Sequence, residues 1–462
     1  MSLIKSISGI RGTIGGKPGD GLSPVDVVKF TTAFGTFLQR RNQEGKRLSL
    51  VVGRDARLSG DMVDRLVVAT LQGMGIDVVE TGLSTTPTTE MTVIDQHADG
   101  GIIITASHNP KHWNALKLLN ARGEFIDAQE GAEVIAIAQN DDFAYADVDT
   151  LGQVHNLPDT IDHHIQRVLA LKLVDAQAIG RAGFRVAVDA VNSTGGIAIP
   201  RLLRALGVND VVELNCQPTG QFAHNPEPIP QNLSQIAHTV VEQHCDLGIV
   251  VDPDVDRLAL VCENGEMFGE EYTLVSVADY VLQHTPGNTV SNLSSSRALR
   301  DITCRYPGCQ YAASAVGEVN VTTLMRRSGA VIGGEGNGGV IYPELHYGRD
   351  ALVGVALFLS LLAKKGLKVS QLRQTYPDYV ISKNRVDLSP EMDVDALLKK
   401  VADKYRATPL CQVSTIDGVK IDFADGWVHL RKSNTEPIIR IYSEAHTQGR
   451  ADDLARQVMA EI

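Results

Sequence analysis

A serine and a histidine stand directly after a short apolar run, on a segment that also predicts a turn. Residues 101–104 read Gly-Ile-Ile-Ile, and residues 105–110 read Thr-Ala-Ser-His-Asn-Pro. The isoleucines predict a buried strand, which the Asn-Pro pair ends. Because open α/β sheets bind ligands at the carboxyl ends of their strands, Ser107 and His108 predict a reaction centre with Ser107 at its heart. A hydrogen-bonded loop without chemistry is the alternative for these six residues alone.

Three carboxylates follow a second apolar run. Asp252, Asp254 and Asp256 stand after residues 247–251, which read Leu-Gly-Ile-Val-Val. Alternate carboxylates on a turn offer oxygen ligands to a small octahedral cation such as Mg²⁺, and without a cation they would repel one another. An EF-hand is rejected because Arg257 stands where that loop needs glycine. An aspartyl-phosphate phosphatase signature would need Thr or Val in place of Asp256, and three solvated aspartates are the remaining alternative.

A glycine-rich run provides a third candidate site. Residues 333–339 read Gly-Gly-Glu-Gly-Asn-Gly-Gly. The run contains a formal G-x-G-x-x-G, but residues 340–343 continue as strand or turn, so a dinucleotide site is not predicted. Glycines let a backbone close on a ligand, and Glu335 and Asn337 can hydrogen-bond sugar hydroxyls. Arg349 adds a cation nearby, and a flexible loop is the alternative.

Charged and hydroxyl donors near the C-terminus predict a phosphate site. They are Arg431, Ser433, Asn434, Thr435 and Arg440. Guanidinium forks, hydroxyls and backbone N–H groups are the donors that bind a phosphate dianion. A helix N-cap is the alternative, although the alternation at residues 438–442 predicts a strand. Arg11 and Lys117 add two further cations that belong near Ser107.

The elements that must position these side chains repeat along the chain. A strand at 50–55 is followed by a helix at 62–73 and a strand at 77–80, and the same order recurs at 186–189, 198–206 and 211–213. A weaker third copy starts near residue 289. Strand–helix–strand units at this spacing predict parallel sheets with right-handed crossovers.

Length and composition shifts predict four domains. A chain of 462 residues exceeds what one hydrophobic core holds. The predicted domains span residues 1–150, 151–260, 261–368 and 369–462. The first three are α/β domains with the serine, metal and sugar loops, and the last is a small α+β domain with the phosphate loop.

Charge and cysteine usage limit the partners and the compartment. The net charge of −12 argues against nucleic acid and anionic membranes as partners. None of the six cysteines forms a C-x-x-C pair, so we expect reduced thiols in a cytoplasmic protein. The N-terminal residues lack the apolar core of a signal peptide. The longest apolar stretch, 351–363, is too short to span a bilayer and predicts a buried helix.

Taken in order, these motifs resemble the α-D-phosphohexomutase family of phosphoglucomutases, phosphomannomutases and phosphoglucosamine mutases. The resemblance runs over essentially the whole chain, through the T-A-S-H-N-P, D-P-D-V-D-R, G-E-G-N-G-G and R-K-S-N-T-E-P motifs. It implies four domains around a central cleft, three related α/β domains and a smaller C-terminal α+β domain.

The resemblance also implies a role for each matching residue. Ser107 would be the phosphoserine, and it would share Mg²⁺ with Asp252, Asp254 and Asp256. Arg11 and His108 would steady the phosphoryl group. Lys117 would be the general acid/base, with a pKa tuned by neighbouring cations. The substrate-binding residues would be Arg257 (also a support of the metal loop), Glu335, Asn337, Arg349, Arg431, Ser433, Asn434, Thr435 and Arg440.

The implied activity is that of an isomerase interconverting glucosamine 6-phosphate and glucosamine 1-phosphate. The reaction would pass through a phosphoserine and a hexose 1,6-bisphosphate, which also serves as activator. Three alternatives stay open: a broad phosphoglucomutase/phosphomannomutase, a Mg²⁺-dependent sugar phosphatase and a non-catalytic phosphosugar sensor. Gly339 and Asn337 replace the histidine and serine of the commoner bacterial sugar loop, and His346 is a candidate substitute for that histidine. A homodimer is left open.

Overall fold

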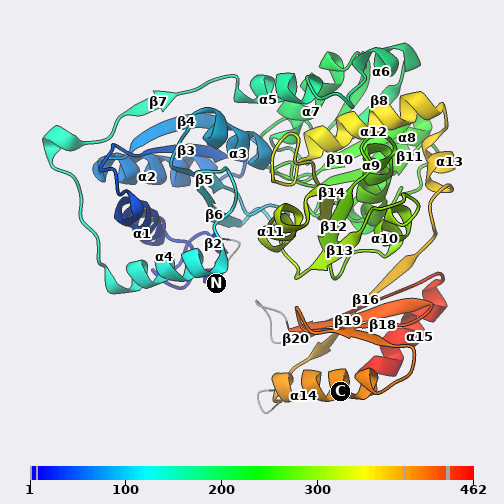
Figure 1. Cartoon of the computed structure of the whole chain (residues 1–462). Helices are drawn as coiled ribbons and strands as arrows, with labels where there is room; N and C mark the ends of the chain where they lie inside the picture. The colour runs from blue at the N-terminus through cyan, green and yellow to red at the C-terminus, as the bar shows by residue number, and fades with distance from the viewer. Residues whose placement is uncertain (1–2, 7–8, 390–391, 433–437, 462) are drawn as a thin grey trace. The chain divides into compact units, whose positions relative to one another are not determined.

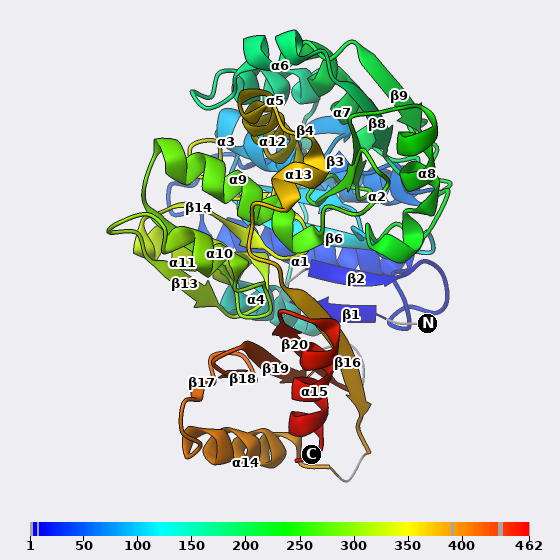
Figure 2. The same cartoon turned by 90° about the vertical axis from the view of Figure 1, so that its right-hand side faces the viewer.

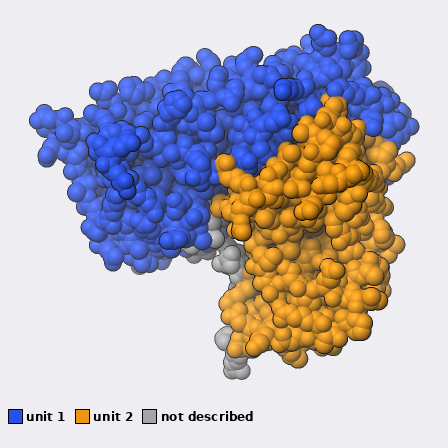
Figure 3. Space-filling view, viewed as in Figure 1, with its two compact units in different colours: residues 1–273, 338–371 blue, residues 274–337, 372–462 orange. Residues whose placement is uncertain are grey.

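The computed structural model describes residues 3–6, 9–389, 392–432 and 438–461. The chain divides into two compact units, coloured separately in Figure 3. Unit 1 comprises residues 1–273 and 338–371, and unit 2 comprises residues 274–337 and 372–462. Each unit is therefore built from two separate segments of the chain.

The first sheet has seven strands, in the order β1-β2-β6-β5-β3-β4-β7. They are β1 (Leu3–Ser6), β2 (Gly9–Thr13), β3 (Ser49–Arg54), β4 (Asp77–Leu83), β5 (Gly100–Ile104), β6 (Trp113–Asn120) and β7 (Val154–Asn156). Strands β5, β3, β4 and β7 are parallel, whereas β1, β2 and β6 extend the sheet with antiparallel pairs. The opposite directions of β1 and β2 are visible in Figure 2. The carboxyl ends of β3 and β5 therefore lie at the same edge of the sheet.

Helices cover both faces of this sheet. They are α1 (Pro24–Arg41), α2 (Gly60–Gly73), α3 (Thr86–Asp95) and α4 (Ala128–Asn140). Leu50 and Ile102 pack in one core with residues of α1, α2 and α4, whereas Val51 and Ile103 pack in another with Val93 of α3. Successive side chains of a strand point to opposite faces, so the continuous apolar runs at 50–52 and 102–104 follow from burial on both sides.

The second sheet has the order β11-β10-β8-β9. Its strands are β8 (Arg185–Asp189), β9 (Asp210–Leu214), β10 (Leu247–Val251) and β11 (Leu258–Cys262), and the nearby helices are α5 (Thr160–Leu169), α6 (Ala176–Ala182), α7 (Gly195–Ala205) and α8 (Ser234–Glu242). Two 3₁₀ turns, η1 (Val148–Thr150) and η2 (Pro230–Asn232), lie in the connections. Strand β8 is parallel to β9 and β10, whereas β10 and β11 are antiparallel and joined by residues 252–257.

The third α/β region carries the sugar loop. Its elements are α9 (Glu270–His284), β12 (Asn288–Asn292), α10 (Ala298–Thr303), β13 (Tyr311–Ser314), α11 (Glu318–Ser328), β14 (Ala330–Glu335), β15 (Gly339–Ile341), α12 (Ala351–Lys365) and α13 (Val369–Arg373). Strand β12 pairs in parallel with β13 and β14. Helix α12 is buried from Ala351 to Leu362, as the apolar run predicts.

The fourth sheet is antiparallel throughout, in the order β16-β20-β19-β18-β17. Its elements are β16 (Val380–Asp387), α14 (Val394–Arg406), β17 (Gln412–Ser414), β18 (Val419–Asp422), β19 (Gly426–Lys432), β20 (Ile438–Ala445) and α15 (Gln448–Met459). Both helices, which lie beside the sheet in Figure 1, share one hydrophobic core with it. The small α+β domain predicted at the C-terminal end of the sequence is confirmed.

The predicted repeats are also confirmed. The order β3-α2-β4 recurs as β8-α7-β9 and as β12-α10-β13, with parallel strand pairs each time. The domain boundaries at residues 150, 260 and 368 stay predictions. Among the helices that the structure describes, none combines the length and apolar character needed to cross a bilayer.

Candidate active site

Ser107 and Asp252, 145 residues apart in the sequence, are hydrogen-bonded in unit 1. The Ser107 hydroxyl donates to Asp252 Oδ2 at 2.7 Å, and its backbone N–H donates to Thr105 Oγ1 at 2.9 Å. Ser107 is 4% exposed and has a φ of 48°, in the left-handed region that residues other than glycine rarely adopt. The turn after β5 thus holds the hydroxyl against the metal loop in a strained backbone conformation, a pattern common at functional sites.

A buried ion pair that the motif analysis missed holds the serine loop. Arg57 Nε lies 2.9 Å from Asp55 Oδ2, and both side chains are fully buried. The Arg57 guanidinium also donates to the backbone carbonyls of Ser107, Pro110 and Trp113. Asp55 and Arg57 follow β3, whose carboxyl end lies beside that of β5. The position of Asp55 and Arg57 directly after a parallel strand is the sequence feature that could have identified them as site residues.

The three aspartates of the metal loop form a cluster suited to a cation. Asp252, Asp254 and Asp256 are fully buried, and one carboxylate oxygen from each lies within 4.8 Å of the other two. Within the described part of the chain, Asp254 Oδ1 and Asp256 Oδ1 are buried and accept no hydrogen bond. Buried carboxylate oxygens without a donor are costly, and a hard divalent ion would satisfy them. The residues therefore fit Mg²⁺.

Backbone strain and neighbouring hydroxyls shape this loop. Val255 has a φ of 64°, which is an outlier for a β-branched residue, and it lies between two of the aspartates. The hydroxyls of Ser193 and Thr194 donate to the Pro253 carbonyl at 2.7 and 2.9 Å. The Thr86 hydroxyl, at the start of α3, donates to Asp254 Oδ2 at 2.6 Å. Elements from both α/β regions therefore fix the loop.

The pKa values of the aspartates diverge because their surroundings differ. Burial, followed by the nearby Asp256 and Asp254, raises the pKa of Asp252 well above its usual range. Burial alone would also raise the pKa of Asp254, but the ammonium of Lys117 and the Thr86 hydroxyl hold it below its usual value. Closely spaced buried carboxylates repel one another, and a bound cation would remove that repulsion.

Lys117 lies beside the three buried aspartates. From β6 its Nζ reaches Asp254 Oδ2 at 2.7 Å and Asp256 Oδ2 at 3.6 Å. Burial alone would lower the pKa of Lys117, but the two carboxylates raise it. The expectation that cations surround Lys117 and lower its pKa is therefore wrong for this arrangement. Its role as acid/base stays a prediction.

Three arginines lie near His108, the residue after Ser107. Arg11, on β2, donates from Nη1 to Asn109 Oδ1 at 2.8 Å, and Arg349 donates from Nη2 to Asp256 Oδ2 at 2.7 Å. Arg257 Nε lies 3.9 Å from Asp256 Oδ1. Arg257, burial and Arg11 together hold the pKa of His108 well below its usual range, so its ring is neutral at pH 7. An anionic group on Ser107 would be favoured in this field.

The predicted sugar and phosphate residues belong to unit 2. Glu335, at the end of β14, accepts at Oε1 from Asn292 Nδ2 at 2.8 Å and from the Gly317 N–H at 3.1 Å. Asn337 Nδ2 lies 3.5 Å from Glu335 Oε2. Arg431 of β19 and Arg440 of β20 are paired in register, which places their side chains on one face of the sheet. Ser433, Asn434 and Thr435 lie outside the described residues.

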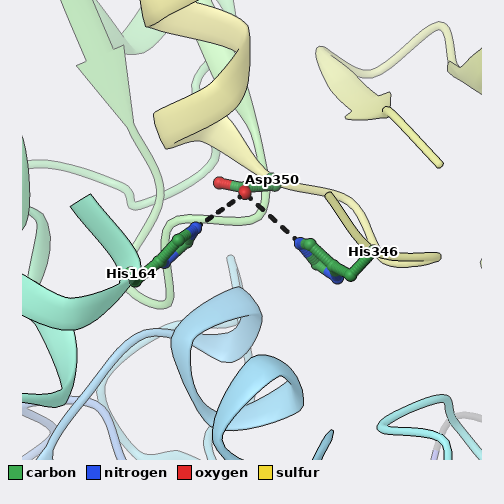
Figure 4. Close-up of side chains that lie close together, drawn as sticks. All are labelled: His164, His346 and Asp350. Carbon is green, nitrogen blue, oxygen red and sulfur yellow. Dashed lines mark hydrogen bonds and ion pairs between the residues drawn. The ribbon is translucent and has the colours of Figure 1, made fainter. Parts of the chain in front are cut away.

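His346 belongs to a buried cluster in unit 1 (Figure 4). Its Nε2 lies 3.3 Å from Asp350 Oδ2, which also lies 2.9 Å from His164 Nε2. Its Nδ1 lies 3.4 Å from Glu90 Oε2. Asp350 Oδ1 accepts from the backbone of Leu352 and so caps α12. These contacts explain the cluster as a link between α5 and the start of α12, and both ring nitrogens of His346 face carboxylates.

Protein-family models match this chain over nearly its whole length. Four models of the phosphoglucomutase/phosphomannomutase family match in order: alpha/beta/alpha domain I at residues 3–145, domain II at 162–265, domain III at 269–379 and the C-terminal domain at 385–461. The chain belongs to this family. It is therefore a phosphohexomutase, and members of the family are isomerases.

The relatives of this phosphohexomutase carry two kinds of name. A phosphoglucomutase/phosphomannomutase of Thermococcus kodakarensis is 36% identical, with 95% of each chain covered. A probable phosphoglucosamine mutase of Methanopyrus kandleri is 32% identical over 97% of this chain and 95% of its own. The crystal structure of a phosphoglucomutase/phosphomannomutase family protein from Burkholderia thailandensis matches with a TM-score of 0.84 and 26% identity, covering 99% and 97%. The predicted four-domain fold and family are confirmed.

Proposed function

We propose that this phosphohexomutase interconverts glucosamine 6-phosphate and glucosamine 1-phosphate through a phosphoserine at Ser107. The observation that carries the proposal is the 2.7 Å contact between Ser107 Oγ and Asp252 Oδ2, beside two buried carboxylate oxygens without donors. This contact supports the proposal that a phosphoryl group on Ser107 would lie next to a cation held by the aspartates. The similarity to a probable phosphoglucosamine mutase supports the amino sugar as substrate.

Mg²⁺ would be held by Asp252, Asp254 and Asp256 together with the phosphorylated Ser107. When bound, the ion supplies positive charge to the phosphoryl oxygens, whose transfer depends on positioning and charge neutralisation. Arg11 and His108 would steady the same oxygens, and Arg257 and Arg349 would add positive charge around them. These groups would hold the phosphoryl in line between Ser107 Oγ and the incoming sugar hydroxyl.

The transfer breaks the bond from phosphorus to Ser107 Oγ and forms one to the free hydroxyl of the hexose phosphate. The hydroxyl proton then needs an acceptor, and Lys117 is our candidate because its Nζ lies beside Asp254. A cation on the aspartates would compete with the lysine charge for the same oxygens and so favour the neutral amine. In the return step, Lys117 would give the proton back.

The product of the first step is a hexose 1,6-bisphosphate, which must turn round and return its other phosphate to Ser107. A phosphate site that accepts either end suits this need. Glu335 and Asn337 would hold the hydroxyls in both orientations. The phosphate site would consist of Arg431, Ser433, Asn434, Thr435 and Arg440.

A broad phosphoglucomutase/phosphomannomutase is the second candidate, favoured by the 36% identical relative. The six free cysteines support a cytoplasmic location. A homodimer is compatible with a site whose proposed residues all lie in one chain. A sugar phosphatase would share the aspartates and the phosphate site without needing a phosphoserine.

The deciding experiment measures kcat/KM for glucosamine 1-phosphate, glucose 1-phosphate and mannose 1-phosphate, with Mg²⁺ and a trace of hexose 1,6-bisphosphate. We expect a preference of about tenfold or more for the amino sugar, which equals about 1.4 kcal/mol of transition-state discrimination. Equal or better turnover of glucose or mannose phosphate would identify the second candidate. Release of inorganic phosphate without isomerisation would identify a phosphatase.

Intact-mass measurement tests the carrier. We expect one phosphoryl group after incubation with hexose 1,6-bisphosphate, and none in Ser107→Ala, which should also lack mutase activity while keeping its melting temperature within a few degrees. Full activity of this variant would reject the phosphoserine mechanism, and an unphosphorylated wild type that binds hexose phosphate would identify a sensor.

A further inference from the structure

Two residues with proposed substrate roles, Glu335 and Arg431, lie on different sheets of unit 2. A continuous chain of hydrogen bonds and ion pairs connects them. We propose that Ser294, His429 and Asp417 form a positioning frame that fixes Arg431 relative to Glu335, with His429 at its centre. The roles of Glu335 and Arg431 rest on the proposed function, whereas the frame itself rests on contacts.

The hydrogen bonds of His429, on β19, settle the protonation of its ring. Nε2 lies 2.7 Å from the Asp417 carbonyl oxygen, which can only accept, so Nε2 carries the proton. Nδ1 of the neutral ring is then an acceptor, and the Ser294 hydroxyl, 2.8 Å away, donates to it. His429 is 2% exposed, and burial lowers its pKa to about 4, so this neutral form persists at pH 7. The side chain is thus a fixed two-ended link.

The Asp417 end of the frame holds the phosphate-binding arginine. Arg431 Nε lies 2.8 Å from Asp417 Oδ2, and the Val316 N–H donates to the same oxygen at 2.9 Å. Asp417 stands in the turn between β17 and β18, whereas Val316 follows β13. The carboxylate therefore joins the arginine to a loop of the third α/β region.

The Ser294 end holds the sugar-binding carboxylate. The Ser294 N–H donates to Asn292 Oδ1 at 2.9 Å, and Asn292 Nδ2 donates to Glu335 Oε1 at 2.8 Å. The Gly317 N–H, next to Val316, donates to the same Glu335 oxygen at 3.1 Å. The residues at the end of β12 thus link His429 to Glu335, and the loop after β13 links Asp417 to the same Glu335. Because His429 and Asp417 are themselves hydrogen-bonded, the network closes into a ring.

This ring has a consequence for binding. A hexose phosphate has a nearly fixed distance between its phosphate and its ring hydroxyls, so both ends bind well only when the two protein groups are held at a matching distance. Pre-organised groups lose less freedom on binding. Loosening the frame should weaken binding of every hexose phosphate, while the hydrogen bond between Ser107 and Asp252, which lies in unit 1, stays intact.

Calorimetric titration with glucosamine 6-phosphate tests the frame without requiring turnover. We expect Ser294→Ala and His429→Gln, which keeps a donor for the Asp417 carbonyl, to raise Kd about three- to tenfold, the range that loss of one hydrogen bond gives. The double variant should be no weaker than the worse single variant, because the two residues share one link. In turnover assays KM should rise while kcat changes less than about twofold.

Two controls separate positioning from stability. Ser294→Thr keeps the hydroxyl donor and should bind as the wild type does. Ser443→Ala removes a buried hydroxyl of the same sheet, which donates to the Ala451 carbonyl at 2.7 Å, and should lower the melting temperature without changing Kd.

The frame is overturned if folded Ser294→Ala binds glucosamine 6-phosphate within twofold of the wild type, or if Ser443→Ala weakens binding equally. Absence of wild-type binding would also overturn it. A wild type that binds hexose phosphate but does not isomerise it would reject the proposed function alone, because the Kd comparison still decides the frame. If His429→Gln fails to fold, Ser294→Ala and Ser294→Thr carry the test.

Discussion

Asp254 is the residue at which the chemistry of unit 1 converges. One of its oxygens receives Thr86 Oγ1 and Lys117 Nζ, while the other is buried without a donor among the described residues. A single carboxylate therefore faces a hydroxyl, an ammonium and the proposed cation. Its charge, rather than its shape, should be what the site requires.

Asp254→Asn tests this requirement at constant volume. We expect turnover at about 1 mM Mg²⁺ to fall by roughly two orders of magnitude. The bound ion would stabilise the transferring phosphoryl group, and the substitution removes one of its charged ligands. Raising the Mg²⁺ concentration should restore part of the activity. The measurement is kcat as a function of Mg²⁺ concentration.

Asp61→Asn is the matched control, since Asp61 is exposed and pairs with Arg65 on α2 at 2.8 Å. This variant should keep its Mg²⁺ dependence. An Asp254→Asn enzyme that behaves in the same way would remove Asp254 from the proposed metal site.

Residue types were easier to predict than residue surroundings. Ser107 and Asp252 each follow a strand and Glu335 ends one, all within short motifs, so the sequence identifies them by position. The surroundings of Lys117 were not predictable, because its carboxylate partner Asp254 is 137 residues away in the sequence. Arg57 was missed for a related reason: its five-donor guanidinium serves backbone carbonyls, which leave no pattern in a sequence.

At the scale of elements, the loops after parallel strands touch at backbone distance. Gly220 has a φ of 70°, and a Cβ built on it would lie 2.0 Å from the carbonyl oxygen of Ala56. Ala56 stands between Asp55 and Arg57, the pair that holds the serine loop. Gly220 therefore influences the position of Ser107 indirectly, through its close contact with Ala56.

Gly220→Ala should displace the Ala56 carbonyl. We expect it to lower the stability of unit 1 by about 1–3 kcal/mol, as overpacking does, and to lower kcat at the same time. Urea unfolding and turnover are the measurements. Gly183→Ala has the same backbone strain, with a φ of 65°, but nothing lies within 4 Å of its added Cβ. If both variants lose stability and activity equally, the contact with Ala56 has no effect beyond the φ strain.

Elements with strong periodicity were predictable, and short edge strands were not. The helix expected at 62–73 spans Gly60–Gly73, and the strand expected at 77–80 extends to Leu83. Strand β7 has three residues, Val154–Asn156, of which two are exposed, so it carries no apolar pattern. Strand β7 forms because it pairs in parallel with β4. This pairing depends on the tertiary fold and leaves no pattern in the local sequence.

At the scale of the molecule, Asp350 links elements that are distant in the sequence. Burial alone would raise its pKa, but His164 and His346 hold that pKa below the usual value. The cluster also includes Thr88, 2.9 Å from His164 Nδ1, and Glu90 beside His346. The folded state therefore keeps this carboxylate ionised at a pH where the unfolded chain protonates it.

Acid should remove the stability that this ionised carboxylate contributes. The contribution is full above the unfolded pKa near 3.8 and is lost as pH falls through that range toward the lower folded pKa. We expect Asp350→Asn to be less stable than the wild type at pH 6, with the difference in melting temperature narrowing by pH 3.

Asp393→Asn is the control for this comparison, because Asp393 also caps a helix, α14, from its N-terminal end. It should show a smaller pH-dependent difference. If the difference in melting temperature between the wild type and Asp350→Asn stays constant from pH 6 to pH 3, the two histidines do not stabilise the ionised form of Asp350.

The number and class of the domains followed from repeats and composition, but the division into compact units did not. The boundary at residue 273 falls inside α9, and the boundary at 371 falls inside α13. A helix reads as continuous in the sequence, so no change of composition marks these positions. The units depend on which residues pack together across the chain, which a single sequence does not display.

The chain passes between the two units at three places, after residues 273, 337 and 371. Neither unit can therefore be cut out as one contiguous fragment. A fragment ending at residue 273 would retain Ser107 and the three aspartates, yet it would lack Arg349, Asp350 and α12, which complete unit 1. A protease that nicks the glycine-rich run would leave two covalent connections intact. Isolating either unit thus requires removing the intervening segment and joining the two that remain, rather than shortening the gene from one end.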